Sequence, residues 1–183
     1  HTLERFAAKF APYGFRPQAF TPCLGMAEST LMTTCTPQAQ APVVLTCDAA
    51  ALAQHRVELL PPSPTNRQAA QRLVSSGRGW LDQTVRIVHP EQRTACAPGE
   101  VGEIWIAGPS VTQGYWQRPA ETTQTFDATL ADTGEGPFLR SGDLGFIHDG
   151  ELFVTGRLKD LIIMRGKNYY PQDLEVTAEQ AHP

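Results

Sequence analysis

The fold signal is strongest at residues 139–160, which read LRSGDLGFIHDGELFVTGRLKD. Two apolar runs, at 146–148 and 152–154, flank the pair Asp149-Gly150. An Asp-Gly pair between apolar runs is the strongest short-range signal for a two-residue β-hairpin. We therefore expect two antiparallel strands that meet at this pair.

Two charged residues near this hairpin could contact a ligand. Asp143 stands between Gly142 and Gly145, where glycine lets backbone approach a ligand closely, and its two acceptor oxygens match the cis hydroxyls of a ribose. Arg157 offers a planar fork of donors that suits ribose or phosphate oxygens. The structural alternatives are an Asp that bonds its own backbone in a tight turn, which local chemistry alone favours, and a surface ion-pair cluster around Arg157.

Further β signals precede the hairpin. Apolar residues alternate at Val85 and Ile87 and again over 101–106, around a Pro98-Gly99 turn, which predicts a second antiparallel pair. Residues 119–126 predict a helix with proline in its first turn. The stretch 99–116 is interpreted as strand, glycine turn and aromatic packing.

The first 35 residues predict helices joined by an extended segment. A helix capped by Thr2 is expected up to Phe10, because apolar residues recur there at helical spacing. Residues 15–24 are predicted to be extended and 27–33 to form a second helix. Glu28 follows the glycine of Gly25-Met26-Ala27 at the start of that helix, where the helix dipole alone would favour a carboxylate.

The segment 36–78 has a different composition. Val43–Thr46 and Arg56–Leu60 predict short strands, and Asp48 can cap a helix between them. Residues 61–66 are rich in proline and polar residues, which indicates a flexible connection. The alternative is that the whole segment is a surface loop.

Composition narrows the class of protein. The chain has 183 residues and a net charge of −4, without a run of Lys and Arg, which argues against nucleic acid as a partner. Its 41% hydrophobic content favours a folded chain, and its longest apolar runs are too short to cross a bilayer. The 15 glycines and 15 prolines suit a turn-rich, mainly β chain. Since the chain opens on a helical repeat without an initiator Met, we expect a piece of a longer protein.

Several common sites are not indicated by the sequence. The four cysteines, at 23, 35, 47 and 96, form no Cys-x-x-Cys pair, and the histidines do not show metal-ligand spacing, which argues against zinc. Without a secretory signal, reduced thiols and a cytoplasmic location are expected. Neither a P-loop nor the Gly-x-Ser-x-Gly motif of α/β-hydrolases occurs.

Three stretches, taken in order, resemble the adenylate-forming superfamily, and within it the fatty acyl-AMP ligases. They are PCLGMAE at 22–28, GDLG at 142–145, and TGRLKDLIIMRGKN at 155–168 followed by YPQDLE at 170–175. The string YPQD is the most particular to fatty acyl-AMP ligases. The resemblance implies an α+β fold: the end of a second α/β lobe (1–35), an insertion (36–78), a distorted β-barrel (79–158), and the hinge with the start of a small C-terminal domain (159–183).

The resemblance also implies a reaction. Fatty acid and ATP give acyl-adenylate and pyrophosphate, and the acyl group passes to the phosphopantetheine thiol of an acyl carrier protein. Glu28 resembles the catalytic, magnesium-binding glutamate, and Gly25, Met26 and Ala27 the turn along the adenylate. Asp143 resembles the ribose ligand, Arg157 its companion and Lys159 the hinge residue.

Two other interpretations remain open. One is a medium- or long-chain acyl-CoA ligase, which the expected insertion disfavours. The other is a non-catalytic β module that binds nucleotide or a partner protein. The family's phosphate loop would precede residue 1 and its catalytic lysine would follow residue 183, so the isolated chain is expected to be inactive.

Overall fold

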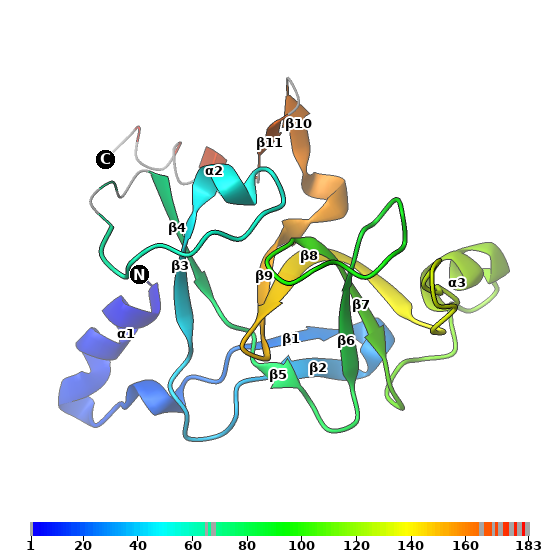
Figure 1. Cartoon of the computed structure of the whole chain (residues 1–183). Helices are drawn as coiled ribbons and strands as arrows, with labels where there is room; N and C mark the ends of the chain where they lie inside the picture. Colours follow the sequence, from blue (N-terminus) through cyan, green and yellow to red (C-terminus); the bar gives the residue numbers. More distant parts are fainter. Residues whose placement is uncertain are drawn as a thin grey trace.

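A computed structural model describes residues 2–64, 66, 69–164, 167–169, 171, 174, 175, 178 and 181. At its centre is an antiparallel sheet of four strands in the order β6-β7-β8-β9 (Figure 1). The strands are β6 (Thr84–Val88), β7 (Gly102–Ala107), β8 (Leu139–His148) and β9 (Glu151–Arg157). Both predicted strand pairs are therefore confirmed, as is the helix α3 (Pro119–Phe126), which lies at one end of the molecule.

The hairpin between β8 and β9 turns at Asp149-Gly150, as predicted. Both residues have positive φ, 49° and 78°, which is the backbone that a two-residue turn matching the strand twist requires. His148 pairs with Glu151, and Phe146 with Phe153. The register shifts at a bulge between Leu144 and Gly145, and beyond this bulge Asp143 pairs with Arg157.

The N-terminal segment forms helix α1 (Thr2–Phe10), as predicted, and the sheet β1-β2-β5. Its strands are β1 (Cys23–Met26), β2 (Leu31–Cys35) and β5 (Arg78–Gly79), with short 3-10 turns at Ala11–Tyr13, Pro17–Ala19 and Ala27–Ser29. The helix predicted over 27–33 is wrong beyond its first turn. Thr30 and Leu31 have φ of 54° and 83°, a left-handed backbone that ends the turn. The following residues form β2, which pairs with β1, and this pairing gives the backbone N–H and C=O groups the hydrogen bonds that they need.

Segment 36–78 is not an open surface loop. Strands β3 (Val44–Asp48) and β4 (Ala70–Val74) pair antiparallel, and Asp48 caps helix α2 (Ala49–Leu52) by accepting the Ala51 amide at 2.8 Å. The strand predicted at 56–60 forms only isolated bridges, from Arg56 and Leu59. One buried cluster joins the segment to the central sheet: Cys47, Leu52, Leu73, Val101, Leu144, Phe146 and Phe153.

The α+β class is confirmed, but a closed barrel is not. In the order β6-β7-β8-β9 the outer strands β6 and β9 do not pair, so the sheet of the described residues stays open. Beyond the turn Leu158–Asp160, strands β10 (Ile162–Met164) and β11 (Lys167–Tyr169) form a separate pair. Most of residues 170–183, expected to belong to the small C-terminal domain, lie outside the described residues. Within the described part, no helix has the length and apolar content of a membrane span.

Candidate functional site

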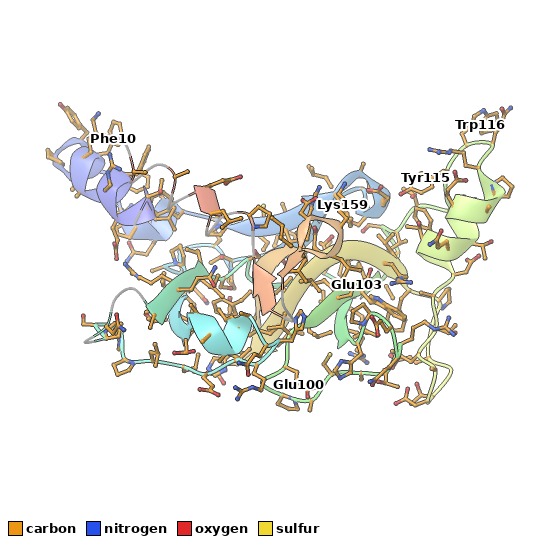
Figure 2. The ribbon with its side chains drawn as sticks, turned by 90° about the horizontal axis from the view of Figure 1, so that it is seen from above. Phe10, Glu100, Glu103, Tyr115, Trp116 and Lys159 are labelled. Atoms are coloured by element: carbon orange, nitrogen blue, oxygen red, sulfur yellow. The ribbon has the colours of Figure 1, made fainter. Side chains whose placement is uncertain are left out.

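A cleft of about 590 Å³ lies between the Ala27–Ser29 turn and the start of the 158–160 turn. It brings together six of the seven predicted site residues, Asp143 being the exception; its lining is Gly25, Met26, Ala27, Glu28, Ser141, Gly142, Arg157, Leu158 and Lys159. Lys159 lies centrally, between α1 and α3 (Figure 2). Gly25 is required here, because a Cβ would lie 2.0 Å from the Leu31 carbonyl oxygen.

Asp143 lies beside this cleft and is joined to it through Arg157. The two residues are directly opposite in the β8–β9 ladder, and Arg157 Nε donates to Asp143 Oδ1 at 3.0 Å. Asp143 and Arg157 also line an adjoining cavity of about 620 Å³. The tight-turn interpretation of Asp143 is wrong, because the residue lies inside a strand and its carboxylate contacts Arg157.

Burial and charge act in opposite directions on the Asp143 carboxyl. The residue is only 7% exposed, and this burial raises its pKa, although the charge and hydrogen bond of Arg157 partly offset the effect. The Arg157 side chain is 56% exposed. A buried carboxylate next to an exposed guanidinium places hydrogen-bond acceptors and a positive charge side by side.

The backbone around Asp143 is held by one side chain of its own strand, Ser141, and one of the neighbouring strand β7, Glu103. Ser141 Oγ donates to the Ile104 carbonyl at 2.7 Å and accepts the Asp143 amide at 3.0 Å. The Gly142 amide donates to Glu103 Oε1 at 3.2 Å. The part of β8 that carries Asp143 is therefore held at Ser141, at Gly142 and at the Asp143 amide itself.

Glu103 is a central residue that sequence reasoning missed. It is 2% exposed, and its Oε2 accepts the Trp105 indole at 2.9 Å and two Arg140 nitrogens at 3.0 and 2.7 Å. Figure 2 labels it in the middle region of the molecule, and it belongs to the inner strand β7. The available signal was a carboxylate inside an apolar strand, since a buried charge needs partners.

Glu28 is held by an aromatic residue from a distant segment. Tyr115 Oη donates to Glu28 Oε1 at 2.8 Å, and the Thr112 amide donates to the Glu28 carbonyl at 2.8 Å. Tyr115 also packs edge-on against Phe126 of α3, with 5.2 Å between ring centroids. Burial and the hydrogen bond to Glu28 raise the pKa of the Tyr115 phenol. Sequence reasoning treated this tyrosine only as aromatic packing.

We expect Glu28→Gln to lower the pKa of Tyr115 towards its usual value near 10, because the negative charge that opposes phenolate formation is removed. The measurement is NMR titration of tyrosines carrying ¹³C at Cζ, with the Tyr115 signal assigned from Tyr115→Phe. Glu135→Gln, an exposed carboxylate paired with Arg86, is the control and should leave the Tyr115 titration unchanged. An unaltered Tyr115 pKa in Glu28→Gln would show that the contact is absent in solution.

Comparisons with known proteins find a matching family model and similar ligases. The family model described as AMP-binding enzyme matches residues 1–116. JamA of Moorena producens (strain JHB), a medium-chain-fatty-acid–[acyl-carrier-protein] ligase, is 48% identical over 100% of this chain and 31% of its own length. FadD26 of Mycobacterium tuberculosis, a long-chain-fatty-acid–AMP ligase, is 44% identical over 98% of this chain and 31% of its own.

The chain is also similar in structure to a solved ligase. The fatty acyl-adenylate ligase of L. pneumophila, in complex with acyl adenylate and pyrophosphate, superimposes with a TM-score of 0.79 at 42% identity. The match covers 100% of this chain and 31% of that chain. This chain thus spans about a third of the length of the proteins it resembles.

Proposed function

This chain belongs to the AMP-binding enzyme family, and from this premise we propose that it is part of a fatty acyl-AMP ligase. Such an enzyme activates a fatty acid with ATP as acyl-adenylate and passes the acyl group to the thiol of an acyl carrier protein. The observation that carries the proposal is the Asp143–Arg157 pair beside the cleft that holds Glu28. The names of JamA and FadD26 support the substrate class and, for JamA, the acceptor.

We assign the nucleotide to the cleft and the cavity that share Arg157. Their volumes, about 590 and 620 Å³, lie within the range of small-molecule sites. Asp143 Oδ1 is held by Arg157, and a carboxylate has a second oxygen that can accept a ribose hydroxyl. The backbone of Gly25, Met26 and Ala27 would then lie along the adenylate.

We assign the magnesium site to Glu28. The fit is chemical: carboxylate oxygens are the ligands that Mg²⁺ prefers, and Tyr115 engages only Oε1 in the hydrogen bond it donates, so Oε2 can face a cation. Magnesium, when bound, offsets the negative charge of the triphosphate as pyrophosphate leaves. Tyr115 orients the carboxylate towards the cleft by fixing one of its oxygens.

We assign the hinge to Lys159 and the choice of acceptor to its surroundings. Leu158 and Leu161, on both sides of it, pack against the buried cluster that contains Leu52 and Leu73 of segment 36–78. Hinge and segment therefore share one apolar core. Rotation about Lys159 has to disturb that core, so the core restrains the hinge. A restrained hinge hinders the conformation that uses CoA, which supports an acyl carrier protein as the acceptor.

The test uses the full-length ligase that contains this chain. We expect fatty-acid-dependent exchange between ATP and pyrophosphate, followed by acyl transfer at least about tenfold faster to an acyl carrier protein carrying phosphopantetheine than to CoA. The measurements are exchange of labelled pyrophosphate and chromatography of the two acyl products. A faster reaction with CoA would replace the proposal by an acyl-CoA ligase, and a lack of exchange would replace it by a non-catalytic binding module.

A further inference from the structure

A second group of ligand-type side chains lies apart from the cleft, in the connection between β6 and β7. His89, Cys96 and Glu100 are each partly buried, and their nitrogen, sulfur and carboxylate oxygen lie within 4.8 Å of one another. His89 Nε2 and Glu100 Oε2 are 3.3 Å apart. In Figure 2 Glu100 lies at the edge of the molecule away from Lys159 and Tyr115. This group is therefore distinct from the proposed nucleotide site.

Each of the three residues stands on backbone that hydrogen bonds hold in place. The His89 amide donates to the Thr94 carbonyl at 2.9 Å, and the Cys96 amide donates to the Ile87 carbonyl at 2.9 Å. The Glu100 amide donates to the Ala97 carbonyl at 3.1 Å, and the Ala97 amide donates to Glu100 Oε2 at 2.8 Å. Two consecutive turns thus present the three side chains to one point.

We propose that His89, Cys96 and Glu100 form a binding site for a zinc ion. Imidazole, thiolate and carboxylate are the three ligand types that Zn²⁺ accepts, and three protein ligands with one open position is a recurrent zinc arrangement. Tetrahedral bonds of zinc to nitrogen and oxygen place these atoms about 3.3 Å apart, which the His89–Glu100 distance of 3.3 Å already satisfies. The sulfur lies within 4.8 Å of both atoms, which exceeds the corresponding spacing of about 3.6 Å by at most about 1.2 Å.

The open position of the ion would face a cavity. His89 also lines a space of about 590 Å³ whose wall includes His55, Leu158 and Leu161. A water molecule or the second imidazole could complete the coordination from this side. Through His89, the site thus borders the same cavity as the two leucines that flank Lys159.

Binding would exchange a proton for the metal. Zinc binds cysteine as thiolate, so the Cys96 thiol has to give up its proton when the ion binds. On binding, the S–H bond breaks, the proton passes to solvent and the sulfur bonds to Zn²⁺ as thiolate. One proton released per ion is therefore a signature of the site. Six residues separate His89 from Cys96 and three separate Cys96 from Glu100, which matches no common zinc motif, and this is why the spacing of cysteines and histidines argued against zinc.

The test is calorimetric titration of the chain with Zn²⁺ alone, repeated in buffers of different ionisation enthalpy. We expect one ion per chain and release of one proton. Titration with Co²⁺ should produce a thiolate-to-cobalt absorption band. Cys96→Ser, His89→Gln and Glu100→Gln should each weaken zinc binding at least about tenfold, and Cys96→Ser should abolish the band.

The controls are close in type and position. Cys23→Ser changes an exposed free cysteine, and Glu91→Gln an exposed carboxylate on the same turn as His89; both should bind zinc as the parent does. Circular dichroism without metal confirms folding, and serine is suited to position 96 because the sulfur is packed against Gly102. Binding that is unchanged in Cys96→Ser, or a cobalt band lost in Cys23→Ser instead, would overturn the proposal. Titrations without a binding event would overturn it as well.

Discussion

Asp143→Ala is expected to weaken binding of a non-hydrolysable acyl-adenylate analogue by about 30- to 900-fold in the full-length ligase, or about 2–4 kcal/mol. The reason is the loss of charge-assisted hydrogen bonds from the ribose hydroxyls to a carboxylate that is only 7% exposed. Arg157 would lose its partner, but its side chain is 56% exposed and stays solvated. The loss should therefore appear in ligand affinity more than in folding stability.

The measurement is calorimetry with the analogue, with thermal unfolding of the unliganded protein as the folding control. Asp132→Ala, at an exposed position six residues after the end of α3, is the matched control and should bind as the parent does. If Asp143→Ala binds as tightly as Asp132→Ala, Asp143 is not the ribose ligand.

Affinity for the acyl-adenylate analogue is also expected to depend on pH through Asp143. Because burial raises the pKa of Asp143 above its ordinary value, protonation on acidification occurs earlier than for an exposed aspartate. Affinity for the analogue should fall as pH drops through that raised pKa, since only the ionised carboxylate offers both oxygens as acceptors. Asp143→Asn should bind more weakly and lose this part of the pH dependence.

Local sequence signals were sufficient to predict those elements that are determined by interactions between residues close together in the sequence. The Asp149-Gly150 hairpin, helix α3 with its proline at the start, and the Asp48 cap of α2 all formed as predicted. The helix expected over 27–33 failed because Thr30 and Leu31 take left-handed backbone and the following residues pair with β1. That pairing is a tertiary contact, which no local propensity contains.

The site shows the same division. The hairpin turn alone would place Asp143 opposite Gly156, whereas the bulge between Leu144 and Gly145 shifts the ladder so that Arg157 lies opposite instead. A Cβ on Gly145 would lie 2.5 Å from the Phe153 carbonyl oxygen, so the glycine permits the close approach at the bulge. The resemblance to a known family pointed to both Asp143 and Arg157, but the bulge that places them opposite one another could not be predicted from the hairpin turn.

The contacts of Glu103 could not be predicted either, because its partners come from three separate points of the sheet. Trp105 and Arg140 donate to one oxygen and the Gly142 amide to the other. A charge that is 2% exposed is tolerated only while these donors surround it. Glu103 therefore connects the stability of the sheet to the position of Asp143, one residue beyond Gly142.

Glu103→Ala is accordingly expected to lower the free energy of unfolding by about 3–5 kcal/mol, because Arg140 would remain largely buried without its carboxylate. Urea unfolding followed by circular dichroism measures the change. Glu135→Ala is the control, since its pair with Arg86 is 44% exposed on both sides and should contribute no more than about 1 kcal/mol. Equal losses of stability in Glu103→Ala and Glu135→Ala would show that the buried carboxylate does not hold the sheet together.

Glu103→Gln keeps an acceptor and a similar shape, so it should fold even if the alanine variant does not. Its neutral amide holds Arg140 and Gly142 less firmly, so this variant should bind the acyl-adenylate analogue more weakly than Glu135→Gln does.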